Sequence, residues 1–429
     1  MKLLQSLKDS RIISPFVLKL LFIMLVVEFV KGALLLTILP VYMKTALNAS
    51  AFVIGWTLAA QYIGDNILRT PVGWIIDKIG YRTTMLSGVI ITLLSVVIIA
   101  TTSEYIWTII ACTLLGLGTA PLWPCVVTGS TEVAGDEAKG TIMSVVYMAW
   151  LSGVGLGPVV INFFILDSDY HLAFRLIVGC TLAVVLVAFL LPRKAPGQTE
   201  KASSAGPGLL PKQPQKKVQS STKKAVSSRK ERIINYYREV KRSMSVSPLL
   251  FPAMFAQSFA LGILTPILTL YAKEILKLSS SQYSLFLIVG GIVTVIFLIP
   301  VGKLVDRFGI RWFLTVGLAI SSATLLIFTS IHSLTLLYVF VALLGLGYAF
   351  MIPSWNALIA SAIPPDKRGA VWGFFLTIEG SGMIVGPIVS GKLWDVYGPQ
   401  APFWVSGIVL IALLVLQLFI STPKKVVLR

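Results

Sequence analysis

Cysteine and histidine are scarce in this chain, which has three cysteines and two histidines among 429 residues. Cys112, Cys125 and Cys180 lack the spacing of a metal site or a disulfide framework, so we expect them to be small packing residues. His171 and His332 fall at the ends of apolar segments, and the sequence holds no Ser-His-Asp, metal-ligand or phosphate-loop pattern. These absences predict that the chain is not an enzyme and uses no metal or cofactor.

Charge is scarce as well, because 13% of the residues are charged whereas 56% are hydrophobic, and the mean hydropathy is +0.86. So little polar surface cannot cover a soluble globule. The apolar runs are about 20 residues long, the length that a helix needs to cross a hydrocarbon core of about 30 Å. They are continuous rather than alternating, which favours helices over membrane strands. We therefore expect an all-α membrane protein with twelve spans, near residues 15–40, 51–72, 83–101, 106–130, 141–166, 171–192, 249–272, 281–301, 312–331, 334–360, 370–392 and 402–421.

The chain also repeats itself at a constant offset of 229 residues. Gly157-Pro158 returns as Gly386-Pro387, for example. A period this long excludes a solenoid, whose units run about 20 to 50 residues. We therefore predict two pseudo-symmetric six-helix bundles, residues 1–192 and 248–429, joined by a linker over residues 193–247.

The distribution of basic residues predicts the orientation in the membrane. The linker has 14 basic and 3 acidic residues and is rich in Ser, Pro and Gln, so it cannot form a core and is expected to be largely disordered. Its last part is either an amphipathic helix on anionic lipid or a solvated charge run. With both termini in the cytoplasm, 28 of the 36 Lys and Arg residues fall on the inner side, as the positive-inside rule requires of a cell-membrane protein. The same rule accounts for the net charge of +18 without a nucleic-acid partner.

Two related stretches follow spans 2 and 8, GWIIDKIGYR at residues 73–82 and GKLVDRFGIR at residues 302–311. The pair resembles the signature loop of the major facilitator superfamily, with Tyr81 and Ile310 where that family usually has a basic residue. The resemblance covers the chain apart from the linker and implies a secondary transporter whose two bundles rock about a central site. The acids of the motif are expected to cap facing helices, and its bases to pair with acids or lipid phosphates. It implies a conformational latch made of Gly73, Asp77, Lys78, Gly80, Arg82, Gly302, Asp306, Arg307, Gly309 and Arg311.

A second motif, GVGLGP at residues 153–158 with its copy GMIVGP at residues 382–387, is similar to the core of an antiporter motif of that superfamily. Ile161-Asn162 stands where the antiporter motif has a double glycine, and Thr113 where drug-proton antiporters commonly have an arginine. The second departure puts arginine-assisted proton coupling in doubt, although export is still favoured over import. Small residues allow close helix approach, and proline weakens the backbone. We expect helix bending at Gly153, Gly157, Pro158, Gly382, Gly386 and Pro387.

Ionisable residues inside the spans are the main functional clue, because each costs at least about 2.5–3.5 kcal/mol at the bilayer centre unless it is paired or hydrated. Glu28 and Lys31 share a face of span 1 near the midplane. Span 2 presents a polar stripe at four-residue steps, which must face other helices or a wet cavity. Either these groups are closed ion pairs that orient helices, or an acid changes protonation during transport. The candidates for proton coupling or substrate binding in this half are Glu28, Lys31, Gln61, Asp65 and Arg69.

The C-terminal half has fewer ionisable candidates. Glu28 corresponds to Gln257 and Asp65 to Thr294 in the repeat, so coupling chemistry is expected in the first bundle. Glu379 in span 11 is the exception, with either a coupling, a cation-binding or a hydrogen-bonded structural role. Aromatic residues have two open interpretations, as packing residues or as ring faces for an amphipathic ligand. The candidates for lining a cavity are Trp123, Tyr147, Trp150, Gln257 and Trp355.

Three functions follow from these features. The first is a proton-coupled carrier that exports a small or amphipathic solute by alternating access. The second is a lipid or glycolipid flippase, since a polar N-terminal half beside an apolar C-terminal half resembles the glycolipid flippases of the superfamily. The third, a non-transporting membrane sensor or enzyme, is disfavoured because the chain lacks a catalytic constellation. The expected partners are the substrate, protons and membrane lipids, and we expect a monomer.

Overall fold

The computed structural model describes residues 14–69, 71–165, 169–192, 248–362 and 368–420, without the side chains of residues 69, 73, 74, 77, 134–140, 360–362 and 368–374. The elements of this described part are all helices. They are α2 (Pro15–Gly32), η1 (Ala33–Ile38), α3 (Leu39–Thr45), α4 (Ala51–Arg69), α5 (Pro71–Ile79), α6 (Tyr81–Thr101), α7 (Tyr105–Thr119), α8 (Leu122–Ile161), η2 (Asn162–Phe164), α9 (His171–Phe189), α12 (Leu250–Leu270), η3 (Tyr271–Ile275), α13 (Ser280–Phe308), α14 (Ile310–Phe328), α15 (Leu334–Ala362), α16 (Arg368–Tyr397) and α17 (Ala401–Phe419).

The expected membrane spans correspond to these helices. Among the described residues, ten helical segments are long and apolar enough to cross a membrane, including Tyr105–Val133 and Thr141–Phe164, which divide α8 between two spans. The other two expected spans are the helices α4 and α16, whose polar and charged residues lower their hydropathy. The all-helical prediction is confirmed. The predicted linker at residues 193–247 lies outside the described part.

The signature stretches differ from the predicted loops. Most of the first copy lies in α5, and the second copy extends α13 to Phe308. The helices break at Gly80 and Gly309, which have φ angles of 82° and 97° before α6 and α14 begin. This left-handed conformation costs little for glycine because it has no Cβ. The motif therefore makes a sharp helix-to-helix corner rather than an open loop.

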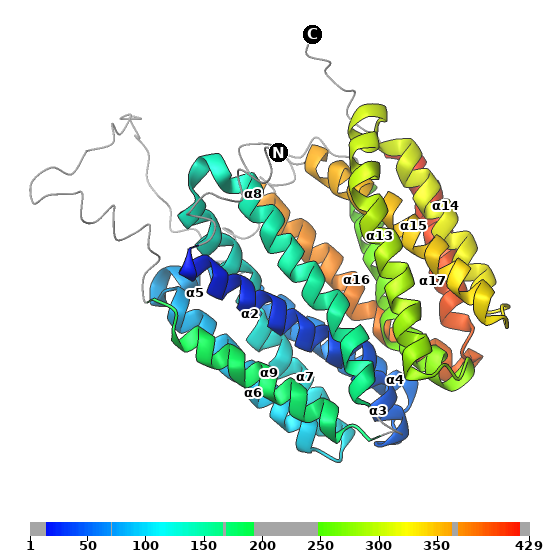
Figure 1. Ribbon diagram of the computed structural model, residues 1–429. Helices are drawn as coiled ribbons and strands as arrows, with labels where there is room; N and C mark the ends of the chain where they lie inside the picture. Colours follow the sequence, from blue (N-terminus) through cyan, green and yellow to red (C-terminus); the bar gives the residue numbers. More distant parts are fainter. Residues whose placement is uncertain (1–13, 70, 166–168, 193–247, 363–367, 421–429) are drawn as a thin grey trace, which may run out of the picture.

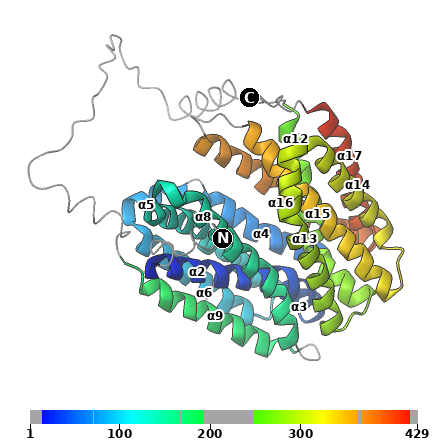
Figure 2. The ribbon, with the colours of Figure 1, turned by 45° about the horizontal axis from the view of Figure 1, so that its top comes forward.

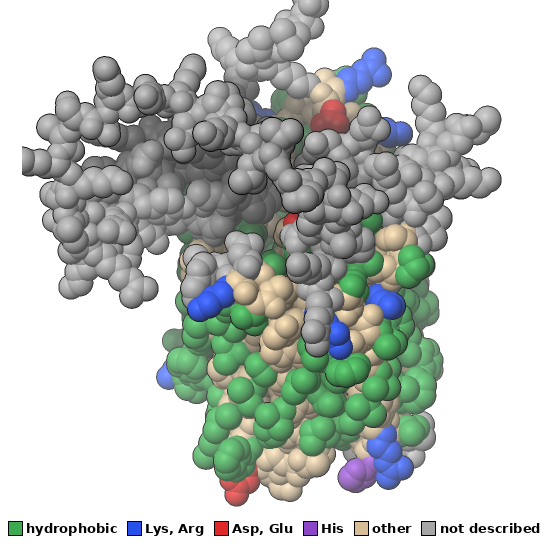
Figure 3. Space-filling view, turned by 90° about the vertical axis from the view of Figure 1, so that its left-hand side faces the viewer, with side chains coloured by type: hydrophobic (Ala, Val, Ile, Leu, Met, Phe, Trp, Pro, Cys, Tyr) green, Lys and Arg blue, Asp and Glu red, His purple; other side chains and the backbone are tan. Residues whose placement is uncertain are grey.

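The helices form two groups, α2 to α9 and α12 to α17 (Figures 1 and 2). Helix α4 of the first group packs against α16 of the second. On the face shown in Figure 3, hydrophobic side chains form a broad band, and most charged side chains lie toward its two borders. A band of this kind matches the hydrocarbon layer of a bilayer. We call the end of the molecule with Gly80 and Gly309 the motif end, and the end with Ser50 and Ser279 the far end.

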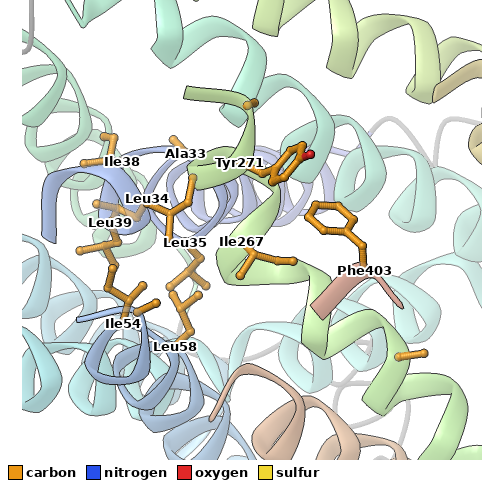
Figure 4. Close-up of a cluster of buried hydrophobic side chains, with 14 of the residues drawn as sticks. Ala33, Leu34, Leu35, Ile38, Leu39, Ile54, Leu58, Ile267, Tyr271 and Phe403 are labelled. Carbon is orange, nitrogen blue, oxygen red and sulfur yellow. The ribbon is translucent and has the colours of Figure 1, made fainter. Parts of the chain in front are cut away.

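Two clusters of buried hydrophobic side chains make up the core. One cluster includes both halves, because Leu34 and Ile54 from the first half belong to it together with Ile267 and Phe403 from the second (Figure 4). The other contains first-half residues of the motif end, such as Met85. The halves therefore share a continuous apolar core at the far end, whereas the motif end of the first half has a core of its own.

Glycines allow several helices to pack backbone against backbone. A Cβ at Gly153 would lie 2.9 Å from the Cβ of Glu28 on α2, and one at Gly386 would lie 2.7 Å from the carbonyl carbon of Gly262 on α12. Between the halves, a Cβ at Gly55 on α4 would overlap the carbonyl group of Pro387 on α16. The small residues of the second motif thus hold α8 against α2 and α16 against α12, as their spacing predicts.

The packing of α8 on α2 yields a stability prediction. A methyl group at Gly157 would overlap Phe29 O and lie 2.9 Å from Ala33 N. Overpacking of this kind costs about 1–3 kcal/mol, so Gly157→Ala should lower the melting temperature of the detergent-purified protein, as followed by tryptophan fluorescence. Gly155→Ala is the matched control on the same helix, because nothing lies within 4 Å of its Cβ position. Equal melting temperatures for the two variants would contradict this account.

Candidate functional site

The first ionisable pair lies on α2, in the N-terminal half. Lys31 Nζ is 3.3 Å from Glu28 Oε1, and Glu28 is 7% exposed. The i,i+3 spacing puts both side chains on one face of the helix. An ion this deeply buried is costly unless a counter-ion and hydrogen bonds compensate it, and here Lys31 supplies both.

The polar stripe of α4 faces the protein interior, as expected. Thr57 and Gln61 are 0% and 1% exposed, and Asp65 is half-buried. Asp65 interacts electrostatically with both Glu28 and Lys31 of α2. The side chain of Arg69 lies outside the described part, and its role as a candidate stays a prediction.

Tyr62 belongs to the same cluster, although we did not select it from the sequence. Its hydroxyl group lies within electrostatic range of Lys31, Asp65 and Glu28. Tyr62 is not part of the polar stripe, whose members are four residues apart. It is three residues before Asp65, however, and residues three apart also share a face of a helix. This spacing is the sequence signal that could have identified Tyr62. We call Glu28, Lys31, Tyr62 and Asp65 the acid–lysine cluster.

Two amide side chains beside this cluster have buried oxygen atoms with no hydrogen-bond donor among the described residues. They are Gln61 Oε1 and Asn66 Oδ1. Native proteins satisfy most buried polar atoms, because an unsatisfied one costs about 1–3 kcal/mol. Both residues lie on α4, the helix that also carries Asp65.

Glu379 on α16 forms a separate site in the C-terminal half. Its Oε1 accepts a hydrogen bond of 3.2 Å from Trp355 Nε1 on α15. The next residue, Gly380, lies against the side-chain amide of Asn66 on α4. The structure therefore puts Glu379 at the contact between the two halves. Gln257, the repeat counterpart of Glu28, is half-buried on α12.

Three of the four aromatic candidates form one group on α8. The ring centroids of Trp123 and Tyr147 are 5.1 Å apart, and Trp150 lies 6.3 Å from Trp123 and 6.4 Å from Tyr147. Tyr147 is 47% exposed, so the group presents ring surface. Trp150 is one turn before Gly153, which packs on Glu28, and this brings the rings near the acid–lysine cluster. The fourth, Trp355, is 3% exposed and belongs to the apolar core.

The signature residues lie at the motif end. Arg82 stacks 4.9 Å from the ring centroid of Phe189, and Arg311 Nη2 donates to Ile420 O at 3.2 Å. Lys78, Asp306 and Arg307 are exposed. The side chain of Asp77 and the contacts of Gly73 lie outside the described part. The expected capping by Asp77 therefore stays a prediction, as does that by Asp306. Gly302 makes only ordinary contact distances, with Pro353 at 3.9 Å from its Cβ position.

Helices α8 and α13 meet at the far end and diverge toward the motif end (Figures 1 and 2). At the far end, Ser284 Oγ donates to Val159 O at 3.1 Å. Toward the motif end, Tyr147 and Met148 on α8 and Ile296 on α13 are 47%, 57% and 60% exposed. Helix α13 is mostly exposed, since 11% of the residues in its most apolar 18-residue stretch are buried. The two helices therefore separate toward the motif end, and exposed apolar side chains lie on both of them.

Comparisons with known proteins agree with this architecture. The chain is 25% identical over 418 residues to a proton-coupled antiporter flippase, LtaA, of Staphylococcus epidermidis, and the alignment covers 95% of both chains. It is 26% identical over 381 residues to a protein of the same name from Staphylococcus aureus, over 87% of this chain and 86% of the relative.

Solved structures share the fold at low sequence identity. The nucleoside transporter NupG superposes with a TM-score of 0.73 at 15% identity, over 96% of this chain and 100% of that one. A D-xylose–proton symporter superposes with a TM-score of 0.70 at 16% identity, over 95% and 98% of the two chains. The family model of the Major Facilitator Superfamily matches residues 21–243 and 250–428, and the chain therefore belongs to this superfamily of transporters.

Proposed function

We propose that this transporter is a proton-coupled flippase, which moves a lipid with a polar headgroup from one leaflet to the other in exchange for protons. The observation that carries the proposal is the juxtaposition of a buried charged cluster and the separation of α8 from α13, two helices with exposed apolar side chains. The first suits a polar headgroup and a proton, and the second suits acyl chains that stay in the bilayer. The names of the staphylococcal relatives agree with both parts of the proposal.

The polar part of the site lies in the N-terminal half. The acid–lysine cluster, the acceptor oxygen of Gln61 and the aromatic group on α8 offer charges, hydrogen-bond acceptors and ring faces. Such groups bind hydroxyl-bearing headgroups, because hydroxyls donate to carboxylate and amide oxygens and apolar sugar faces pack on rings. A carrier for a water-soluble solute would use the same groups but would not need the apolar separation.

The apolar part lies across the separation, on α13. In the repeat, Asp65 and Arg69 of α4 correspond to Thr294 and Leu298 of α13. Thr294 Oγ1 is occupied by hydrogen bonds to Gly290 O and Gly345 O, so this helix presents mainly aliphatic side chains. Acyl chains pack on such a surface without loss of hydrogen bonds.

The burial of Glu28 supports the coupling to protons. Glu28 is 7% exposed and carries its charge beside Lys31, in a low-dielectric site. Because ionised carboxylates are costly to bury, a proton bound by Glu28 or Asp65 would lower the energy of the closed, dehydrated state. Opening toward water favours release of that proton. Alternate protonation and headgroup binding at one cluster would produce antiport.

We also propose how the protein lies in the membrane. With both termini in the cytoplasm, the motif end faces the cytoplasm, and the separation between α8 and α13 opens toward the inner leaflet. The signature residues then act at the cytoplasmic surface and affect the rate and the balance of states rather than the choice of substrate. The protein works as a monomer, since each copy has both halves of the site.

The proton-coupling proposal predicts the effect of neutral isosteres. In proteoliposomes with an imposed pH gradient, Glu28→Gln or Asp65→Asn should reduce the driven translocation of a fluorescent glycolipid to the rate without a gradient, while exchange at equal pH continues. Reduction by dithionite from one side measures the translocated fraction. Glu104→Gln, at an exposed carboxylate outside the cluster, should keep the pH response. A full pH response in both cluster variants would show that their acids are structural ion pairs.

The flippase proposal predicts selectivity for a lipid over its headgroup. A diacyl glycolipid should be translocated, whereas the free sugar headgroup should not accumulate in the same proteoliposomes, because it cannot use the apolar surface of α13. Radiolabelled sugar uptake and the dithionite assay measure the two reactions side by side. Accumulation of the free sugar at a rate comparable to that of the lipid would instead identify a carrier for soluble solutes.

A further inference from the structure

At the far end, a carboxylate of the second half caps a helix of the first. Asp395, in the last turn of α16, accepts hydrogen bonds from the backbone amides of Ala51 (Oδ1, 3.1 Å) and Phe52 (Oδ2, 2.9 Å), the first two residues of α4. The first N–H groups of a helix have no partner within the helix. A carboxylate in this place is stabilised by the hydrogen bonds and by the positive end of the helix dipole.

The surrounding residues bring the two helix ends together. A Cβ at Gly391 of α16 would overlap the carbonyl oxygen of Ala51, so the two backbones are in direct contact. Lys392 Nζ lies 5.7 Å from the ring centroid of Phe52, in a cation–π arrangement. The last turns of α16 thus fit the first turn of α4 closely. Any motion that separates the halves at this end must break the two bonds of Asp395.

The equivalent helix of the second half has a different cap. Helix α13 begins at Ser280, 229 residues after Ala51, and Ser279 and Gln282 form a capping box at its start. Ser279 Oγ accepts from Gln282 N at 3.2 Å, and Gln282 Oε1 accepts from Ser279 N at 2.9 Å. Helix α4 has Val53 in the place of Gln282, and its Ser50 Oγ accepts from Val53 N at 3.3 Å. The capping box pairs the amides of Ser279 and Gln282, whereas Asp395 pairs those of Ala51 and Phe52, so the cap from the other half serves different amides of α4.

We propose that Asp395 is a gate residue, whose carboxylate on the first turn of α4 holds the far end closed and must leave it each time the transporter opens there. Two further bonds between the halves at this end join neutral groups, Thr269 Oγ1 to Leu36 O and Ser284 Oγ to Val159 O. Asp395 adds a charge-assisted contact to them, and such hydrogen bonds are about twice as strong as neutral ones. The inference rests on alternating access and not on a lipid substrate or on proton coupling.

The test measures the distance between the halves at the far end. Spin labels on cysteines at Thr45 and Ser281, both exposed, report this distance by pulsed electron resonance after Cys112, Cys125 and Cys180 are replaced by alanine. Asp395→Asn keeps the size of the side chain but loses the charge and one acceptor. It should raise the ratio of far-open to far-closed protein about threefold to tenfold. Asp395→Glu, which keeps a carboxylate, should shift this ratio less than Asp395→Asn.

Asp169→Asn is the matched control for a far-end carboxylate. Asp169 is also exposed, but it accepts a hydrogen bond of 2.8 Å from His171 N within its own half. Its loss should leave the distance distribution unchanged. The proposal is wrong if Asp395→Asn, with a wild-type melting temperature, keeps the wild-type distribution, or if Asp169→Asn shifts it equally. Because no substrate or gradient is present, failure of the flippase proposal does not affect this result.

Discussion

Charged groups in the hydrocarbon layer must find their partners within the protein, and this constraint organises the N-terminal half. Glu28 and Lys31 on α2, and the stripe of α4 that includes Asp65, are tolerable only when the two helices turn these faces inward. Glycines allow the neighbouring helices to pack closely against α2 and α4. Gly116 brings α7 onto the backbone of Asp65, and Gly153 brings α8 onto Glu28. Helix packing therefore lowers the free-energy cost of burying charge at the acid–lysine cluster, because it brings the charged groups of α2 and α4 together.

The two halves share a repeat but carry different residues at equivalent positions. Where the first half has Glu28 and Asp65, the second has Gln257 and Thr294, and its Glu379 is hydrogen-bonded to a buried tryptophan. The first half therefore carries ionisable and polar groups, and the second presents aliphatic surface. An amphipathic substrate also has a polar and an apolar part, and this match is the physical basis of the proposed function.

The two ends of the molecule differ in how the halves meet. At the far end they share one apolar cluster, illustrated by Leu34 and Ile267 in Figure 4, and polar contacts close its rim. At the motif end the first half has a core of its own, and α8 and α13 diverge. Apolar packing is strong but lacks direction, whereas hydrogen bonds break at defined geometries. A rocking transporter can therefore use the packed region as a pivot and the polar contacts as the parts that open.

The sequence by itself determined the membrane class, the helical spans, the repeat and the family motif, because hydrophobic length, a fixed offset and a glycine at a left-handed corner are local properties of the chain. It also indicated that α4 must turn its polar stripe inward. Tertiary structure alone decided which groups meet: that Asp65 of α4 lies near Glu28 and Lys31 of α2, that Trp355 is core while Trp150 belongs to a partly exposed ring group, and that Asp395 caps α4. Each of these depends on the rotation and crossing of helices far apart in sequence. Helix packing sets those quantities over the whole bundle, and no spacing within one helix encodes them.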